Sequence, residues 1–336
     1  MINIYLILLK SANNSSIMIN LLDNIDILYK TISKEYKKED ICNNIKELDI
    51  TILKSKIYNT LNVSNSSFDW IFCLNYLNSC DNLYKIVYKN ITFYILHCGI
   101  LSNIKKKNFF KNIYRIHLTS KVLNMNEMYV YYIITYSGKR KLPKKNNIIN
   151  ANNINGGFTY KNINEIYIVR YEDYEKVIIH ELLHHNKYID NHMWNARDID
   201  KLKEYFNISE STRLLPNEAV VEVFACLLNV IFKSLENKRN FKELLKIDQQ
   251  HSLVLTRKLL KFQGEKKWQE NSNSFCYIVL KTIFYVYINE FLKDFSRNNS
   301  FNVIINFLFN FYPKIKRKII KYDYLIKNNS LKLTAF

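Results

Sequence analysis

The chain has 336 residues, of which 48% are hydrophobic and 24% charged, and its formal net charge is +19. This hydrophobic content excludes an intrinsically disordered chain, and the length suffices for one large domain or two. A surplus of positive charge is typical of proteins that bind polyanions. The chain carries no aromatic-basic recognition motif, zinc finger or glycine-rich phosphate loop, so we expect no specific nucleic-acid partner.

The N-terminal region, residues 1–125, is predicted to mix helices and strands. Residues 2–10 form an apolar run that we interpret as a strand or a helix, because it lacks the basic start and the cleavage site of a signal peptide. The apolar spacing of residues 17–29 indicates an amphipathic helix. Residues 84–88 and 92–96 are β-rich runs on either side of Lys89-Asn90 and predict a hairpin.

Cysteine usage and hydropathy bear on the compartment in which the protein works. The six cysteines, Cys42 among them, are dispersed and form no C-x-x-C pair, which is typical of reduced thiols in an intracellular protein. No segment offers eighteen uncharged apolar residues in a row, so the sequence predicts no transmembrane span. We therefore expect an intracellular location.

A second region, residues 126–336, is predicted to begin with a small sheet. Residues 129–135 and 165–170 have strand character, and the basic residues 139–145 between them are interpreted as a surface connection. The strand at 165–170 directly precedes the motif described next, and its exposed edge could hold an extended peptide by main-chain hydrogen bonds. Gly156 and Gly157 either admit a peptide backbone close to this edge or form a simple turn.

The pattern H-E-x-x-H lies within the apolar residues 177–185. His180 and His184 are four residues apart, so on an α-helix both imidazoles leave one face, about 6 Å apart along the axis. That spacing lets two ring nitrogens reach one zinc ion. Glu181 lies about 100° round the helix, beside the open coordination position, where it can accept a proton from zinc-bound water. The alternative is an ordinary core helix with satisfied histidines.

Beyond residue 186 the chain is predicted to be mainly helical. A polar connection at 186–216 contains a short helix near 199–206, and further helices are expected at about 217–234, 240–262, 273–295 and 301–321. His251 and Tyr277 lie on two of these helices. We expect structural roles for both, with stabilisation of a tetrahedral oxyanion as the alternative.

A zinc site of the His-His-Glu type needs a carboxylate from a separate helix. The helix expected from residue 217 opens with Asn217, a favourable N-cap residue, and carries Glu218 and Glu222 on one face. Two carboxylates on an otherwise apolar helix are costly unless they bind a metal or a partner. Because both side chains leave the same face, helix geometry alone leaves either glutamate as the ligand.

Other residues near the motif are weaker candidates for the third ligand. Asp190 would need a sharp turn that Lys187 makes less easily than a glycine would. His192 lies on a connection whose path the sequence does not predict. His185 points about 100° away from His184 and is not expected to share the metal.

These motifs resemble a known family. His180-Glu181-x-x-His184 followed by Asn217-Glu218-Ala219 resembles the gluzincin branch of zinc metallopeptidases, in which the glutamate after the asparagine is the third ligand. Stretches between about residues 130 and 300, namely 155–159, 170–180, 218–225, 251–253 and the helix around Tyr277, are also similar to uncharacterised metallopeptidase-like proteins encoded by large nucleocytoplasmic DNA viruses.

The resemblance implies a role for each motif residue. It makes His180, His184 and Glu218 the zinc ligands, Glu181 the catalytic base, and Glu222 the acceptor for the N–H of a ligand imidazole. It implies an α+β, zincin-like core, with a small sheet, an edge strand and the active-site helix, followed by a mainly helical C-terminal part.

The expected function is that of a zinc metallopeptidase, a hydrolase that cleaves a peptide or protein substrate through Glu181-activated zinc-bound water. The alternatives are an inactive zinc-binding structural or host-interaction protein with the same fold, and a basic nucleic-acid-binding protein whose histidines are incidental.

Overall fold

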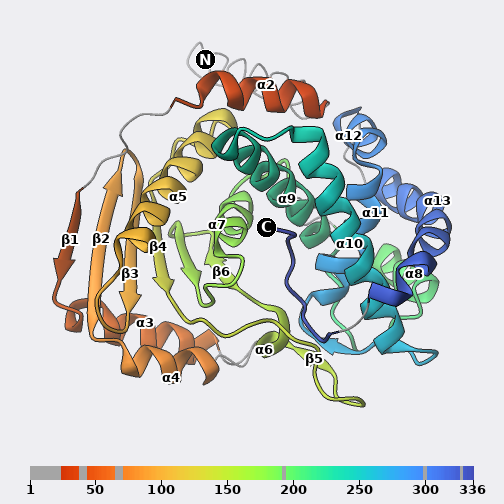
Figure 1. The fold of residues 1–336 in the computed structure, drawn as a ribbon. Coiled ribbons are helices and arrows are strands. Elements are labelled where there is room, and N and C mark those ends of the chain that lie inside the picture. Colours follow the sequence, from red (N-terminus) through yellow and green to blue (C-terminus); the bar gives the residue numbers. More distant parts are fainter. Residues whose placement is uncertain (1–23, 38–43, 65–70, 191–193, 298–300, 326–327) are drawn as a thin grey trace, which may run out of the picture.

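The computed structural model describes residues 24–37, 44–64, 71–190, 194–297, 301–325 and 328–336 (Figure 1). The segment predicted at 2–10, Cys42 and His192 lie outside these residues. Of the helix predicted at 17–29, the described part belongs to α2, Ile25–Glu35. Among the described residues, no helix has both the length and the apolar character needed to span a bilayer.

The protein is α+β, with one mixed sheet of six strands in the order β1-β2-β3-β4-β7-β6. These are β1 Ile45–Leu48, β2 Asn82–Tyr88, β3 Ile91–His97, β4 Tyr129–Ile134, β7 Glu165–Ile168 and β6 Gly157–Tyr160. Strands β3, β4 and β7 are parallel, whereas β1 and β6 at the two edges run antiparallel to their neighbours. The hairpin β2–β3 confirms the prediction, with Lys89 at φ 53° in its turn.

The predicted boundary between residues 125 and 126 falls between two strands of this one sheet. Strands β1 to β3 come from the N-terminal region and β4, β6 and β7 from the second region. Strand β1 lies in the region predicted to mix helices and strands, but no strand was predicted at its position. The strand predicted at 165–170 is internal, because β7 pairs on both sides; the edge belongs to β6.

Successive side chains of the sheet point to opposite faces, and a separate core lies on each. On one face, Tyr131 and Ile133 pack with α5, Asn103–Val122, and with α7, Tyr174–Leu183. On the other face, Tyr132 and Ile134 pack with α3, Thr51–Ser64, and α4, Ile71–Ser79. The sheet is therefore buried between two helical layers, with α7 on the inner side.

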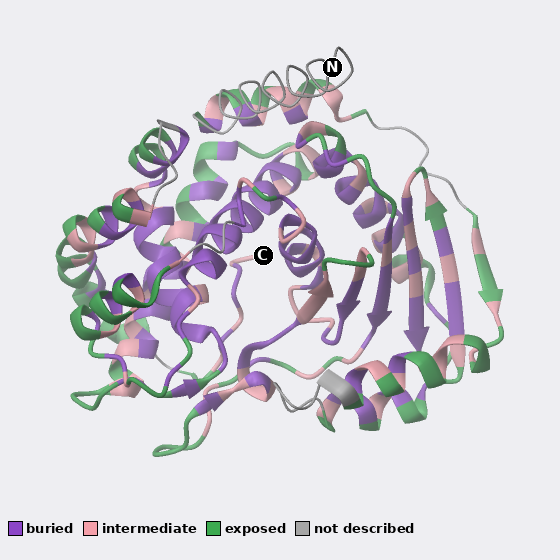
Figure 2. Ribbon diagram, turned by 180° about the vertical axis from the view of Figure 1, so that it is seen from behind, coloured by how far each residue is buried: buried purple, intermediate pink, exposed green. Residues whose placement is uncertain are grey.

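The C-terminal part is helical, as predicted. Its elements are α8 Ala196–Tyr205, α9 Pro216–Asn237, α10 Phe241–Gln263, a π-helical turn Cys276–Leu280, α11 Lys281–Val286, α12 Ile288–Arg297, α13 Phe301–Ile319 and a 3-10 turn Ile320–Leu325. The short α6, Ala151–Ile154, and a two-stranded sheet of β5, Ile149–Asn150, and β8, Glu270–Asn271, lie between the two parts. Helix α9 is buried along most of its length (Figure 2) and packs against α7.

Three local predictions are wrong. The helix predicted at 273–295 is broken, because Tyr287 leaves helical geometry at φ −114° and ψ 44° between α11 and α12. The connection 139–145 is not wholly a surface loop, since the side chain of Arg140 is fully buried. It donates hydrogen bonds to the main-chain carbonyls of Ile154 and Glu172. Asn217 is not the N-cap of α9: Leu215 is, and Pro216 takes the first helical position, which its fixed φ favours.

Candidate metal centre

Three side chains from α7 and α9 converge on one point. His180 lies on α7, and His184 caps that helix with helical backbone angles of φ −61° and ψ −19°. Glu218 lies in the first turn of α9, as predicted. The two Nε2 atoms are 3.2 Å apart, and Glu218 Oε2 lies 3.4 Å from that of His180 and 3.5 Å from that of His184. The packing of α9 on α7 thus brings together residues that are remote in the sequence.

The surroundings of these atoms fit a bound cation. Glu218 Oε2 is buried and makes no hydrogen bond with any described residue. Its separations from the two imidazoles are longer than the roughly 2.7–2.9 Å of a charge-assisted hydrogen bond. A buried carboxylate oxygen facing two imidazole nitrogens has the donor set of a metal site. His180, His184 and Glu218 could therefore hold one metal ion.

Each imidazole is oriented through its other nitrogen. Glu222 Oε2 lies 2.8 Å from His180 Nδ1, and Asp190 Oδ2 lies 2.8 Å from His184 Nδ1. The hydrogen bond to Asp190 keeps the proton of His184 on Nδ1 and leaves its Nε2 as the candidate ligating atom. The contact of His180 Nδ1 with Glu222 is an ion pair outside hydrogen-bond geometry, and the negative charge favours a proton on that nitrogen. Glu222 thus occupies the place predicted for it, whereas Asp190, weighed as a ligand, faces the opposite nitrogen of the ring.

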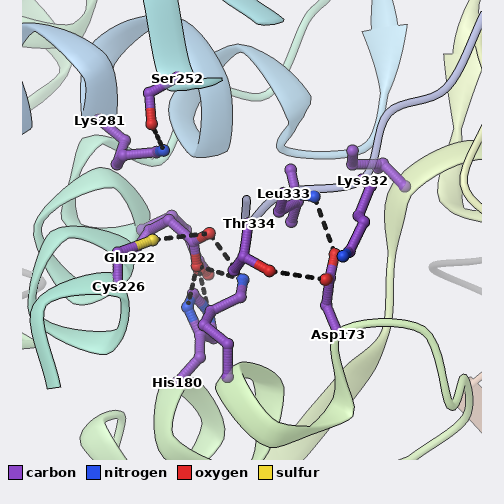
Figure 3. Close-up of polar contacts among 12 residues, drawn as sticks. Asp173, His180, Glu222, Cys226, Ser252, Lys281, Lys332, Leu333 and Thr334 are labelled. Carbon is purple, nitrogen blue, oxygen red and sulfur yellow. Dashed lines mark hydrogen bonds and ion pairs between the residues drawn. The ribbon is translucent and has the colours of Figure 1, made fainter. Parts of the chain in front are cut away.

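The two orienting carboxylates are themselves paired with cations. The buried Lys176 Nζ lies 2.6 Å and 2.8 Å from the two oxygens of Glu222 (Figure 3 shows His180 and Glu222). Lys161 Nζ lies 2.5 Å from Asp190 Oδ2, and Asn217 Nδ2 donates to its other oxygen at 2.7 Å. Without such partners a buried carboxylate would become protonated.

The electrostatics keep the carboxylates anionic. Burial alone would raise the pKa of Glu222, but Lys176 and His180 outweigh it and lower this pKa to about 2. Burial acts likewise on Glu218, where the two histidines lower the pKa well below its usual range. Burial would lower the pKa of His180, but the adjacent carboxylates Glu218 and Glu222 raise it. A metal ion bound at Nε2 would replace the proton that these carboxylates attract.

A small cavity lies beside His180 and Glu181 of α7. Its volume is about 20 Å³, and His180, Glu181, Tyr277 and Arg140 are among its lining residues. Burial raises the pKa of Glu181 above its usual range. The ring of Tyr277 lies 5.6 Å from that of His180, and burial raises its pKa well above 10, so the phenol stays protonated at neutral pH. A space of this size holds about one water.

The other residues considered from the sequence lie away from the metal ligands. His185 points aside, as predicted: its Nε2 lies 2.7 Å from Thr159 Oγ1. Burial, together with the neighbouring His184, lowers the pKa of His185 to about 4. His251 bonds the carbonyl of Lys332 at 2.8 Å and does not line the cavity.

The two glycines make room for side chains of the protein itself. A Cβ on Gly156 would lie 2.2 Å from Arg140 Nη2, and one on Gly157 would lie 3.1 Å from Glu181 Oε1. Gly157 begins β6, and a Cβ there would also lie 2.8 Å from the main-chain oxygen of Tyr167 on β7. The glycines let Arg140, Glu181 and strand β7 approach the edge of the sheet closely.

Sequence reasoning missed Lys176, Arg140 and the orienting role of Asp190. A signal existed for Lys176, because a lysine one turn before His180 on an apolar helix needs an anionic partner.

The chain matches no protein-family model, no curated protein and no solved structure. The geometry of the site is therefore the main indication of what the protein does.

Proposed function

We propose that the protein is a zinc-dependent peptidase of zincin-like architecture, with His180, His184 and Glu218 as the zinc ligands and Glu181 as the general base. The proposal is supported by the arrangement of these residues on α7 and α9, and by the resemblance of the two motifs to gluzincins. The described architecture, with antiparallel edge strand β6 beside α7, is compatible with this assignment.

One observation carries the choice of metal. A tetrahedral ion with ligand bonds of about 2.0–2.1 Å places its ligand atoms about 3.3–3.4 Å apart. The three candidate atoms lie 3.2, 3.4 and 3.5 Å from one another. Two imidazoles and one carboxylate, with a fourth position left open, form the donor set of catalytic zinc. When bound, zinc supplies a Lewis acid that polarises a carbonyl and makes water more acidic.

The chemistry of the chain's own residues suits amide hydrolysis. Glu181 lines the cavity next to His180, where it can accept a proton from an attacking water and deliver it to the leaving amine. Burial raises the pKa of Glu181 towards neutral pH, which favours both the acceptance of a proton from water and its delivery to the amine. Tyr277 keeps its proton and faces the same cavity, so we assign it the stabilisation of the developing oxyanion in preference to a purely structural role.

Edge strand β6 is the element that we assign to substrate binding. Its residues are only partly buried, and it pairs on one side only, with β7. An unpaired edge can accept an extended peptide by main-chain hydrogen bonds. The peptide or protein substrate would lie along Gly157–Tyr160, beside Glu181.

A two-step experiment tests the proposal. Zinc is first quantified on the purified full chain, and we expect about one ion per chain, because three convergent ligands with oriented imidazoles bind tightly. The zinc-loaded protein is then incubated with a broad peptide library, in parallel with Glu181→Gln. The metal assignment fails if no zinc binds after reconstitution at neutral pH.

A second candidate function has one observation in its favour. The cavity beside Glu181 has a volume of only about 20 Å³, which suits a closed site that binds zinc without turning over a substrate. In that case the protein would be a structural or host-interaction protein with an inactive zincin-like fold. Full zinc occupancy without cleavage of any library peptide would favour this alternative.

A further inference from the structure

The C-terminal residues 329–336 run into the middle of the molecule, next to the metal centre (Figures 1 and 3). Leu333 is buried and lines the small cavity together with His180 and Glu181. The neighbours of Leu333 face the other way: Lys332 and Thr334 line a second hollow of about 420 Å³. The segment is thus the partition between the metal centre and a hollow large enough for a ligand.

Three polar side chains hold the backbone of this segment. Asp173 accepts the amide of Leu333 at 2.8 Å (Figure 3), and Asp248 accepts the amide of Ala335 at 2.9 Å. Between them, His251 Nε2 lies 2.8 Å from the carbonyl of Lys332. These bonds hold two amides and one carbonyl of a segment that bends at Leu333 and Thr334, so its main chain is bound in a defined, turned conformation.

The segment also pairs with the chain near Arg140. The amide of Leu331 donates to the Arg140 carbonyl at 3.0 Å, and the amide of Leu142 donates to the Asn329 carbonyl at 2.8 Å. Lys141 and Ser330 form an antiparallel bridge. These bonds are those of a short added strand, so the segment is bound as a peptide would be.

The carboxylates of Asp173 and Asp248 need hydrogen-bond donors in the space that residues 329–336 occupy. The side chain of Asp173 is fully buried and that of Asp248 almost so. Besides the segment, Asp173 contacts Arg140 Nη1 at 3.3 Å, and Asp248 accepts from the hydroxyl of Tyr285 at 3.0 Å. Removing the segment would leave carboxylate oxygens with unfilled acceptor positions, which is costly unless water or another peptide supplies N–H groups.

The small cavity beside Glu181 admits no peptide while the segment is in place, because a space of about 20 Å³ holds one water. The other residues that line it belong mainly to helices and the sheet. Residues 329–336 contribute Leu333 to the cavity lining and form neither a helix nor a strand of the main sheet. They are held mainly by hydrogen bonds with side chains. Access for a peptide therefore requires this segment to move.

We propose that Asp173, Asp248 and His251 form a main-chain clamp for a peptide with an apolar residue at the Leu333 position, and that residues 329–336 occupy the clamp as an intramolecular ligand. Gly157 of β6 and Leu333 line the same small cavity, so a peptide in the clamp would lead towards the edge of β6. The identification of this peptide as the substrate rests on the proposed peptidase function; the clamp itself does not. Displacement would join the small cavity, which His180 and Glu181 line, to the larger hollow.

A buried donor near the clamp favours exchange. Arg140 Nη2 lines the small cavity and makes no hydrogen bond with any described residue. An incoming peptide whose carbonyl reached this nitrogen would gain a hydrogen bond that residues 329–336 do not make. A bond to a charged donor is stronger than a neutral one, so it would offset part of the cost of displacing the segment.

The test is binding of a fluorescent octapeptide with the sequence of residues 329–336 to the full chain, measured by anisotropy. All proteins carry Glu181→Gln so that the peptide is not consumed. Leu333→Asp puts a charge into the apolar position and should expel the protein's own segment. We expect this variant to bind the octapeptide at least about tenfold more tightly than the parent, whose clamp is occupied.

Two matched controls accompany this variant. Leu333→Met keeps the apolar volume and should behave as the parent does. An octapeptide with aspartate in place of its second leucine should not bind. Adding His251→Leu to Leu333→Asp removes the bond to the Lys332 carbonyl and should weaken octapeptide binding about threefold to tenfold. A folded Leu333→Asp protein that binds no octapeptide, or parent binding of equal strength, would overturn the proposal.

Hydrogen exchange of the unsubstituted protein keeps the proposal falsifiable if Leu333→Asp does not fold. The amides of Leu333 and Ala335 should exchange at least about tenfold faster than buried amides of α9, because the segment opens without global unfolding. Equal protection would refute a displaceable segment. Neither readout needs bound zinc or turnover. A metal-free protein with an exchangeable segment would reject only the peptidase proposal, and an active zinc enzyme with a fixed segment would reject only the clamp.

Discussion

Replacing Glu222 by glutamine distinguishes the carboxylate that orients a ligand from the carboxylate that binds the metal. The amide keeps the volume beside His180 Nδ1, which lies 2.8 Å from a carboxylate oxygen of Glu222, but it loses the negative charge of the ion pair. Loss of such an orienting group typically lowers metal affinity about 10–100-fold, or about 1.4–2.7 kcal/mol. Glu218→Gln removes an anionic ligand atom itself and should exceed that upper limit.

In the metal-free protein the order is reversed: Glu222→Gln should lower the free energy of unfolding more than Glu218→Gln does. Glu222 is the partner of Lys176, which is 2% exposed. Breaking a buried ion pair from one side costs about 3–5 kcal/mol in the free energy of unfolding. Glu218 Oε2 faces imidazoles at 3.4 and 3.5 Å and has no lysine partner at such a distance among the described residues, so Glu218→Gln should cost less of this stability than Glu222→Gln does. The matched control is Lys176→Met with Glu222→Gln, which removes both charges and should recover most of the loss.

Zinc retained against a graded chelator and denaturant unfolding of the metal-free proteins measure the two quantities. The assignment is reversed if Glu222→Gln loses the metal while Glu218→Gln keeps it. Equal, small losses of zinc in both variants would point to Asp190 or His192 as the third ligand. An unchanged stability of Glu222→Gln would refute the account of the Lys176 pair.

Three further predictions concern catalysis, acid stability and charge. Glu181→Gln should retain zinc but lower peptide hydrolysis by about 10²–10⁴-fold or more, because the amide cannot accept the proton; turnover at the unsubstituted rate, with zinc content measured in parallel, would exclude the mechanism. Burial alone would raise the pKa of Glu175, but Arg115 and two lysines lower it to about 2. The ionised carboxylate therefore contributes on the order of 3 kcal/mol to the free energy of unfolding. This contribution is present above about pH 4.5 and is lost as the pH falls towards 2. Unfolding at pH 7 and pH 3 should therefore show a smaller acid loss for Glu175→Gln, and an equal loss in both proteins would contradict this. Nucleic-acid binding should be weak, sequence-independent and steeply salt-dependent, so tight, sequence-selective binding in a titration at physiological salt would revive the nucleic-acid hypothesis.

Local sequence determined the elements that carry the chemistry. The four-residue spacing of His180 and His184 needs only helical geometry to place both imidazoles on one face, and the same holds for Glu218 and Glu222 on α9. The β2–β3 hairpin was predictable because the β-rich runs adjoin their turn. The start of α9 was not, because Asn217 binds Asp190 instead of capping its own helix.

The tertiary structure alone decided which residues surround the two motifs. Asp173 and the amide of Leu333 are 160 residues apart, and Lys176 and Glu222 are 46 apart. Neither pair has a periodic signal, because a contact between remote segments depends on how whole helices and strands pack. The position of residues 329–336 beside His180 was equally unpredictable, since a segment without a helix or a strand has no amphipathic period that would indicate what it packs against. The sequence determined the candidate ligands, and the packing of α7, α9 and this segment determined how they are oriented and what can reach them.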